Sequence, residues 1–137
     1  MAMKLKEIIL TIKDFSLNYH NVNSFYDGDI YDNLNGTQQV DYTSVVVTQA
    51  PHNFYFQDEY MMLNFNVFYV DRLTSNGDNR LDIQSAACDF FYRLIEFMED
   101  KAMIVQDYQI TTFQEKFSDL CAGAYLTFSV RVDLNEC

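Results

Sequence analysis

Apolar and polar residues alternate strictly toward the C-terminal end of this chain. From Ala122 to Leu134 every even-numbered residue is apolar, whereas the odd positions hold Gly, Tyr, Thr, Ser, Arg and Asp. A period of two over such a run predicts a long β-strand with one face on a core and the other in solvent. We therefore expect a strand over Cys121–Leu134.

Two other segments carry apolar residues at steps of three and four, which is the spacing of one helix face. The first predicts a helix from about Lys4 to about Tyr19. The second predicts a helix from about Asn79 to about Asp100, where Asp78 or Asn79 can supply the N-cap. The expected buried stripes are Leu5, Ile8, Ile9, Ile12, Phe15 and Tyr19 in the first helix, and Ile83, Ala87, Phe90, Phe91, Leu94 and Met98 in the second.

Runs of β-branched and aromatic residues between and after these helices predict further strands. Tyr60–Val70 is largely apolar on both faces at its far end, so we expect it near the centre of the sheet. Phe54–Phe56 should end a strand just before an acidic tip at Gln57–Glu59. The other expected strands are Val40–Thr48, Ile104–Phe113 and a short one near Phe25 that turns at Asp27-Gly28.

Together these elements predict an α+β protein. Two main helices should pack on one face of an antiparallel β-sheet, in the order α-β-β-β-α-β-β. The chain has 137 residues, one proline and four glycines, which leaves little room for a flexible linker. We therefore expect a single α+β domain over residues 1–137.

The charge balance is strongly acidic, with a formal net charge of −11. A protein that grips DNA by its phosphates needs the opposite sign. The acidic excess serves either solubility alone or a surface that faces nucleic acid without holding it. Composition leaves both alternatives open.

The three cysteines, Cys88, Cys121 and Cys137, are odd in number and show no CxxC spacing. The chain shows no signal peptide and no apolar run of membrane-spanning length, so we expect reduced thiols and synthesis in a cytoplasm. Cys88 falls within the pattern of the second helix, where we expect it to pack as a small hydrophobic residue.

Candidate chemistry is sparse. The two histidines, His20 and His52, have no Cys, Asp or Glu at a familiar ligand spacing. Asp71, Asp78 and Asp82 invite a calcium or hydrolase interpretation, but the glycine and the final acid of a calcium loop are misplaced or missing, so a turn that caps the second helix explains them better. We expect no catalytic, cofactor-binding or metal-binding residue and no enzymatic activity.

Aromatic residues are abundant, with ten Tyr and twelve Phe, more than one small core is expected to hide. Packing on sheet faces accounts for some of them. Tyr and Phe also concentrate in protein–protein contacts, where they bury a large area with few rotors to freeze. The candidate subunit-interface residues are Tyr26, Tyr31, Phe54, Tyr55, Phe56 and Tyr60.

The order of elements and three short segments carry a resemblance to a known group of proteins. The segments are SFYDGD (24–29), FYVDRL (68–73) and FSDLCAGAY (117–125). The layout resembles that of tail terminators and tail-completion proteins from the head–tail neck of tailed phages, and the segments resemble those of neck ring proteins in crAss-like phages. The resemblance in element order covers most of the chain and includes no catalytic signature.

This resemblance implies a structural virion protein of a tailed bacteriophage. Its copies would form a homo-oligomeric ring, sixfold or twelvefold, that links portal and tail proteins while genomic DNA passes the lumen without specific binding. Such a protein is made in the host bacterial cytoplasm, resides in the neck or tail of the virion and has no membrane partner. The contact arm would be the hairpin at Phe54–Glu59 or the loop at Asp27–Gln39. The alternative is a stand-alone cytoplasmic module that binds a protein or ligand without enzymatic activity.

Overall fold

The computed structural model describes residues 4–34, 40–74, 76–116 and 120–134, without the side chains of residues 4, 31, 32, 115 and 116. The helices in this part of the chain are α1 (Lys4–Asn18), α2 (Ile30–Leu34) and α3 (Arg80–Asp100). The strands are β1 (Ser24–Asp27), β2 (Ser44–Gln49), β3 (Asn53–Tyr55), β4 (Tyr60–Arg72), β5 (Ile104–Lys116) and β6 (Leu120–Asp133).

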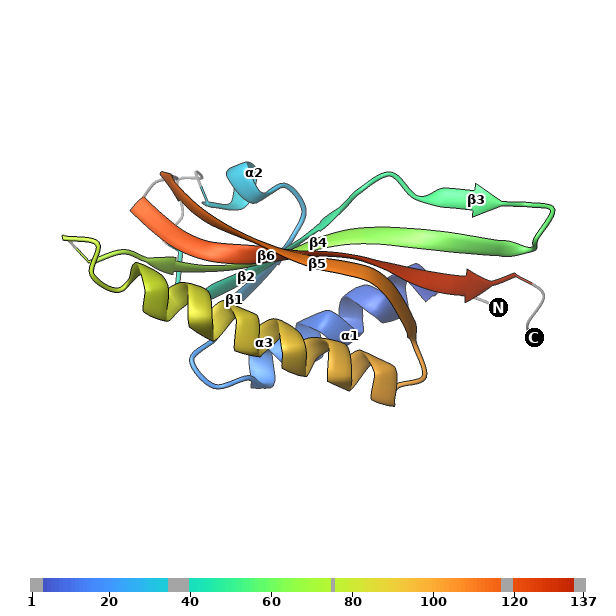
Figure 1. The fold of residues 1–137 in the computed structure, drawn as a ribbon, viewed down its shortest axis with the longest axis horizontal. Coiled ribbons are helices and arrows are strands. Elements are labelled where there is room, and N and C mark those ends of the chain that lie inside the picture. The colour runs from blue at the N-terminus through green and yellow to red at the C-terminus, as the bar shows by residue number, and fades with distance from the viewer. Residues whose placement is uncertain (1–3, 35–39, 75, 117–119, 135–137) are drawn as a thin grey trace.

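The protein has the α+β fold that the sequence predicts. Five strands of its six-stranded sheet have the order β1-β2-β4-β6-β5. The sixth, β3, pairs with residues 60–62 of β4, which β2 does not reach. The two long helices, α1 and α3, lie on one face of the sheet, whereas α2 lies on the other (Figure 1). The predicted central strand, now β4, lies between β2 and β6, and it pairs with β6 along its whole length, from Tyr60 to Arg72.

The sheet differs from the prediction at one edge, where β1 and β2 run parallel and make the sheet mixed. Parallel neighbours need a crossover connection rather than a hairpin. The helix α2, which the sequence pattern did not predict, lies in that connection and packs on the opposite face from α1 and α3 (Figure 1). The predicted turn at Asp27-Gly28 is present as the end of β1, and Gly28 has a φ of 136°.

The main core lies between the sheet and the helices α1 and α3. The buried stripe of α3 is the predicted one, and the even-numbered residues of β6 from Ala122 to Val132 are all buried. A second, smaller core lies under α2 on the other face of the sheet. It consists of Ile30, Leu34, Val40, Val46, Val70 and Cys121. The half of the sheet near β1 and β2 is therefore stabilised by burial of apolar surface on both of its faces.

The two edges of the sheet differ in length. On one side β5 pairs only with β6 among the described strands, and a bulge between Gln106 and Gln109 interrupts its register. Asp107 lies within this bulge and has a φ of 57°. On the other side the short strands β1 and β3 occupy different ends of the edge.

Two local predictions need correction. Cys88 is exposed on α3 rather than packed in the core. Asn79 does precede α3, but its side chain makes no capping hydrogen bond. Its Oδ1 instead accepts a hydrogen bond from the backbone N–H of Thr74, and its Nδ2 donates to the carbonyl of Arg72, so the side chain closes the loop after β4.

Candidate functional site

The hairpin of β3 and the first residues of β4, which we call the hairpin arm (residues 53–62), extends beyond the end of α3 in Figure 1. Every residue from Pro51 to Glu59 is exposed. The backbone of the arm pairs Asn53 with Met62 and Tyr55 with Tyr60. The arm is therefore a paired β-hairpin whose strand β3 and tip lie in solvent, while its β4 residues also pair with β6.

Four of the six candidate interface residues lie in the hairpin arm. The side chains of Phe54 and Phe56 are 57% and 76% exposed, and their ring centroids are 5.8 Å apart. Tyr55 is 41% exposed and stacks on Tyr60 with centroids 4.7 Å apart. The guanidinium of Arg131 lies 4.0 Å from the centroid of the Tyr60 ring, which holds this stack against β6. The arm thus presents a cluster of aromatic rings with defined neighbours.

The other two candidates lie elsewhere. Tyr26 is half-buried in β1 and packs against the smaller core under α2. It faces the opposite end of β4 from the arm, because β1 pairs with β2 and β2 pairs with residues 65–70 of β4. The side chain of Tyr31 lies outside the described residues. The structure therefore does not bring Tyr26 together with the aromatic cluster of the arm.

A residue that sequence reasoning treated only as a loop histidine anchors the arm. The Nδ1 atom of His52 accepts a hydrogen bond of 2.9 Å from the backbone N–H of Asn64. Since Nδ1 accepts, the ring proton is on Nε2, which lies 3.0 Å from Oε1 of Gln49 and donates to it. Desolvation of the ring lowers the pKa of His52, which favours this neutral form. His52 thereby fills the break between β2 and β3, and no motif in the sequence indicated this role.

Two of the three acidic residues that invited a calcium or hydrolase interpretation line one polar cleft of about 590 Å³. Asp71, Asp82 and Asn79 line it, together with the buried Tyr69, whose pKa is raised by burial. Asp78 does not line it and instead accepts a hydrogen bond from Asn76. Among the residues that the structure describes, no group of three or more His, Cys, Asp or Glu side chains could hold a metal ion.

His20 does not line the polar cleft, although its neighbour Asn21 does. Its ring stacks on Tyr19 with centroids 4.5 Å apart, next to the end of α1. No helix in the described part of the chain is long and apolar enough to cross a bilayer.

No family model and no curated protein gives a significant match to the chain. The features that bear on function are therefore the hairpin arm, the sheet edges and the charge.

Proposed function

We propose that this chain is a ring-forming structural protein of a tailed bacteriophage, a component of the head–tail neck or tail terminator that links portal and tail around the DNA channel. The observation that carries the proposal is the exposed aromatic cluster of the hairpin arm. The α+β layout and the net charge of −11 support it further. The proposed role is non-enzymatic and depends on ordered self-assembly.

The hairpin arm favours assembly for an energetic reason. Full burial of a Phe side chain contributes roughly 1.5–3 kcal/mol relative to leaving it in water. Phe54 and Phe56 forgo most of this gain in the isolated chain, because both are largely exposed. Aromatic side chains of this kind are typical of the buried centres of protein interfaces. In a ring of subunits, the same contact repeats between neighbours and would bury these side chains in every copy.

The charge suits a channel protein. DNA phosphates and a surface rich in Asp and Glu repel each other, so an acidic lumen would let the duplex pass without binding it. Twenty acidic against nine basic residues make this surface available. In the assembled ring, acidic side chains should therefore outnumber basic ones on the inner wall.

The test is the mass of the protein by light scattering over a concentration series, followed by negative-stain imaging. We expect closed rings, either from the protein alone or after it is mixed with the portal and tail proteins of the phage. The double variant Phe54→Ser/Phe56→Ser should lose assembly, whereas Tyr92→Ser, which alters an exposed ring on α3, should keep it. A chain that stays monomeric in all these mixtures contradicts the proposal.

A second candidate function is a stand-alone binding module, which the polar cleft favours. Its lining by Tyr69, Asp71, Asn79 and Asp82 offers hydrogen-bonding groups to a small polar or cationic ligand. A monomeric protein whose thermal unfolding is shifted by such a ligand, with the shift lost in Asp82→Asn, would favour this module over the ring.

A further inference from the structure

The outer edge of β5 is protected by the bulge at Asp107, but its first three residues, before the bulge, are not. Ile104 is 45% exposed, Tyr108 and Ile110 are also exposed, and Asp107 is the single charged residue between Ile104 and Gln114. Natural edge strands carry lysines, prolines or strong charges that prevent another strand from pairing with them. The start of β5, before the bulge, is therefore suited to receive a strand from a partner.

A pocket adjoins this edge on the face of the sheet that α1 and α3 cover. Its volume is about 280 Å³, enough for an aromatic side chain. Ile8 of α1, Met103, Val130 and Val132 supply apolar surface, and two acidic residues, Glu7 and Asp133, line the pocket together with Lys101 and Arg131. The apolar wall of the pocket is a suitable receptor for an aromatic side chain.

We propose that the start of β5 and this pocket receive the hairpin arm of a second copy of the chain. The arm's strand β3 adds antiparallel to β5, and Phe54 of the neighbour enters the pocket. This inference rests on the proposed function and names the interface between successive copies of the ring.

Strand directions support this occupant. Within one copy β3 is antiparallel to β4, β4 to β6, and β6 to β5, so β3 is antiparallel to β5. A neighbour that keeps the same face of its sheet toward the helices therefore presents β3 to β5 in antiparallel sense. It must be turned within the plane of the sheet, because its β1 lies one strand farther out than β3 and has to clear the second half of β5. Its helices α1 and α3 then lie on the same face of the continued sheet. A head-to-tail repeat of this kind is what a ring requires.

The position along the strands also matches. Met62 pairs with Asn53 on one side and with Arg131 on the other, and Arg131 pairs with Ile104. Asn53, the first residue of β3, therefore lies at the level of Ile104, and a shift of two residues along the strands would pair β3 with the start of β5. Phe54 projects from the correct face, because its partner Met61 packs against the main core between sheet and helices.

One cation at the start of β5 can meet the acidic tip of the arm. The tip carries Asp58 and Glu59, both exposed. Antiparallel addition places this tip beside the start of β5, where the exposed Lys101 follows α3. Lys101 therefore gives the tip an oppositely charged neighbour, next to the Glu7 and Asp133 that also line the pocket.

The experiment is cross-linking between two single-cysteine variants. In a Cys88→Ser/Cys137→Ser background, which keeps only the buried Cys121, one variant carries Phe54→Cys and the other Ile104→Cys. The two proteins are mixed and treated with a short bis-maleimide. We expect a cross-linked dimer in the mixture and none from either variant alone, because the contact joins different surfaces. A mixture of Phe54→Cys with Leu17→Cys, an exposed position on α1, is the matched control.

The outcomes separate the interface from the proposed function. If light scattering shows rings but the Phe54→Cys and Ile104→Cys chains do not cross-link, the interface is wrong and the ring stands. If Ile104→Cys cross-links with itself, β5 pairs symmetrically and the interface is also wrong. If no assembly forms alone or with portal and tail proteins, the proposed function fails and the interface with it. In assembling protein, Ile104→Lys should abolish rings while Leu17→Lys leaves them intact.

Discussion

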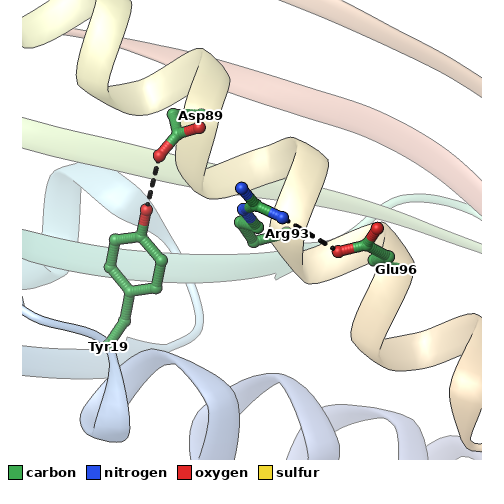
Figure 2. A network of polar contacts seen from close by, with 4 residues as sticks. All are labelled: Tyr19, Asp89, Arg93 and Glu96. Atoms are coloured by element: carbon green, nitrogen blue, oxygen red, sulfur yellow. Dashed lines mark hydrogen bonds and ion pairs between the residues drawn. The ribbon is translucent and has the colours of Figure 1, made fainter.

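The phenol of Tyr19 donates a hydrogen bond of 3.0 Å to Oδ2 of Asp89 and so joins the end of α1 to the middle of α3 (Figure 2). The ring of Tyr19 also meets Phe90 edge-on, with centroids 5.0 Å apart. One turn further along α3, Arg93 and Glu96 form an ion pair at 3.3 Å (Figure 2). Tyr19 therefore contributes both to the core and to the polar contact between the two helices.

Removal of the Tyr19 hydroxyl should weaken the contact between α1 and α3. We expect Tyr19→Phe to lower the free energy of unfolding by about 1 kcal/mol, the net value of a typical hydrogen bond. Urea denaturation followed by circular dichroism measures the change. Tyr92→Phe removes a hydroxyl from an exposed ring and should leave stability unchanged, so equal losses in both variants would contradict a specific role for Tyr19.

The same contact predicts a loss of stability at alkaline pH. Burial, followed by the hydrogen bond and the negative charge of Asp89, raises the pKa of Tyr19 from 10 to about 12. The folded state thus holds this proton more tightly than the unfolded state. The resulting stabilisation is fully present below pH 10 and is lost as the pH rises from 10 through about 12. Stability measured across this range should fall less steeply in Tyr19→Phe than in the wild type.

Gly123 should not tolerate a side chain. A Cβ at this position would lie 1.9 Å from the carbonyl oxygen of Tyr69, which belongs to the paired backbone of β4. We expect Gly123→Ala to cost about 3 kcal/mol, the upper part of the range for overpacking. Thermal unfolding measures this loss.

The control for that substitution is Gly77→Ala. Gly77 has a φ of 73°, and a Cβ added there would meet no atom of the described residues within 4 Å, so only backbone strain of about 1 kcal/mol opposes the methyl group. A loss at Gly123 no larger than that at Gly77 would show that the two strands can separate to make room.

His52 should make the hairpin arm sensitive to acid. Its pKa is lowered in the folded state, so the unfolded chain binds the proton more readily. The stabilisation is fully present above the ordinary pKa of about 6.5 and is lost as the pH falls through the lower folded value. Protonation also removes the acceptor at Nδ1 that holds the N–H of Asn64. We expect NMR signals of residues in the arm to broaden or shift below pH 6.

His52→Asn supplies the matched variant for this prediction. The amide oxygen of Asn can occupy the place of Nδ1 as an acceptor, and it does not titrate. The arm of His52→Asn should keep its NMR signals from pH 7.5 to pH 5, while His52→Ala should lose order at both. Acid sensitivity that persists in His52→Asn would place the titrating group elsewhere.

Two side-chain pairs on the sheet face opposite α1 and α3 should couple β4 to β6. The hydroxyl of Thr127 donates to Oδ1 of Asn66 at 2.9 Å, and that of Ser129 donates to Oδ1 of Asn64 one pair further along. A double-mutant cycle with Asn66→Ala and Thr127→Val should give a coupling energy of about 0.5 kcal/mol. A coupling near zero would mean that water satisfies both groups equally well.

The sequence predicted those helices and strands in which the spacing of apolar residues follows the buried face. The stripe of α3 from Ile83 to Met98 and the alternation of β6 are both present as expected. These patterns are local, because the core faces the same side of one element along its length. The first helix was also placed to within one residue at its C-terminal end, Asn18 instead of about Tyr19.

Features that depend on a distant partner were missed. The parallel pairing of β1 with β2 depends on how the chain returns through α2, and a five-residue helix carries too short a pattern to be recognised. The exposure of Cys88 depends on which part of α3 the sheet covers. The role of His52 depends on Asn64, twelve residues away on β4.

The bulge in β5 has a consequence for the spacing of copies in an assembly. Ile104, Val105 and Gln106 are the only residues of β5 that pair regularly before the bulge, and β3 is also three residues long. Beyond Gln106 the register is shifted, so an incoming strand that slid toward Lys116 would meet a kinked edge and misaligned hydrogen-bonding groups. In the proposed interface, the extra residues around Asp107 would stop an added strand from sliding along β5. A neighbour would then have a single position on this edge, and in a closed ring that position would set the angle between successive subunits.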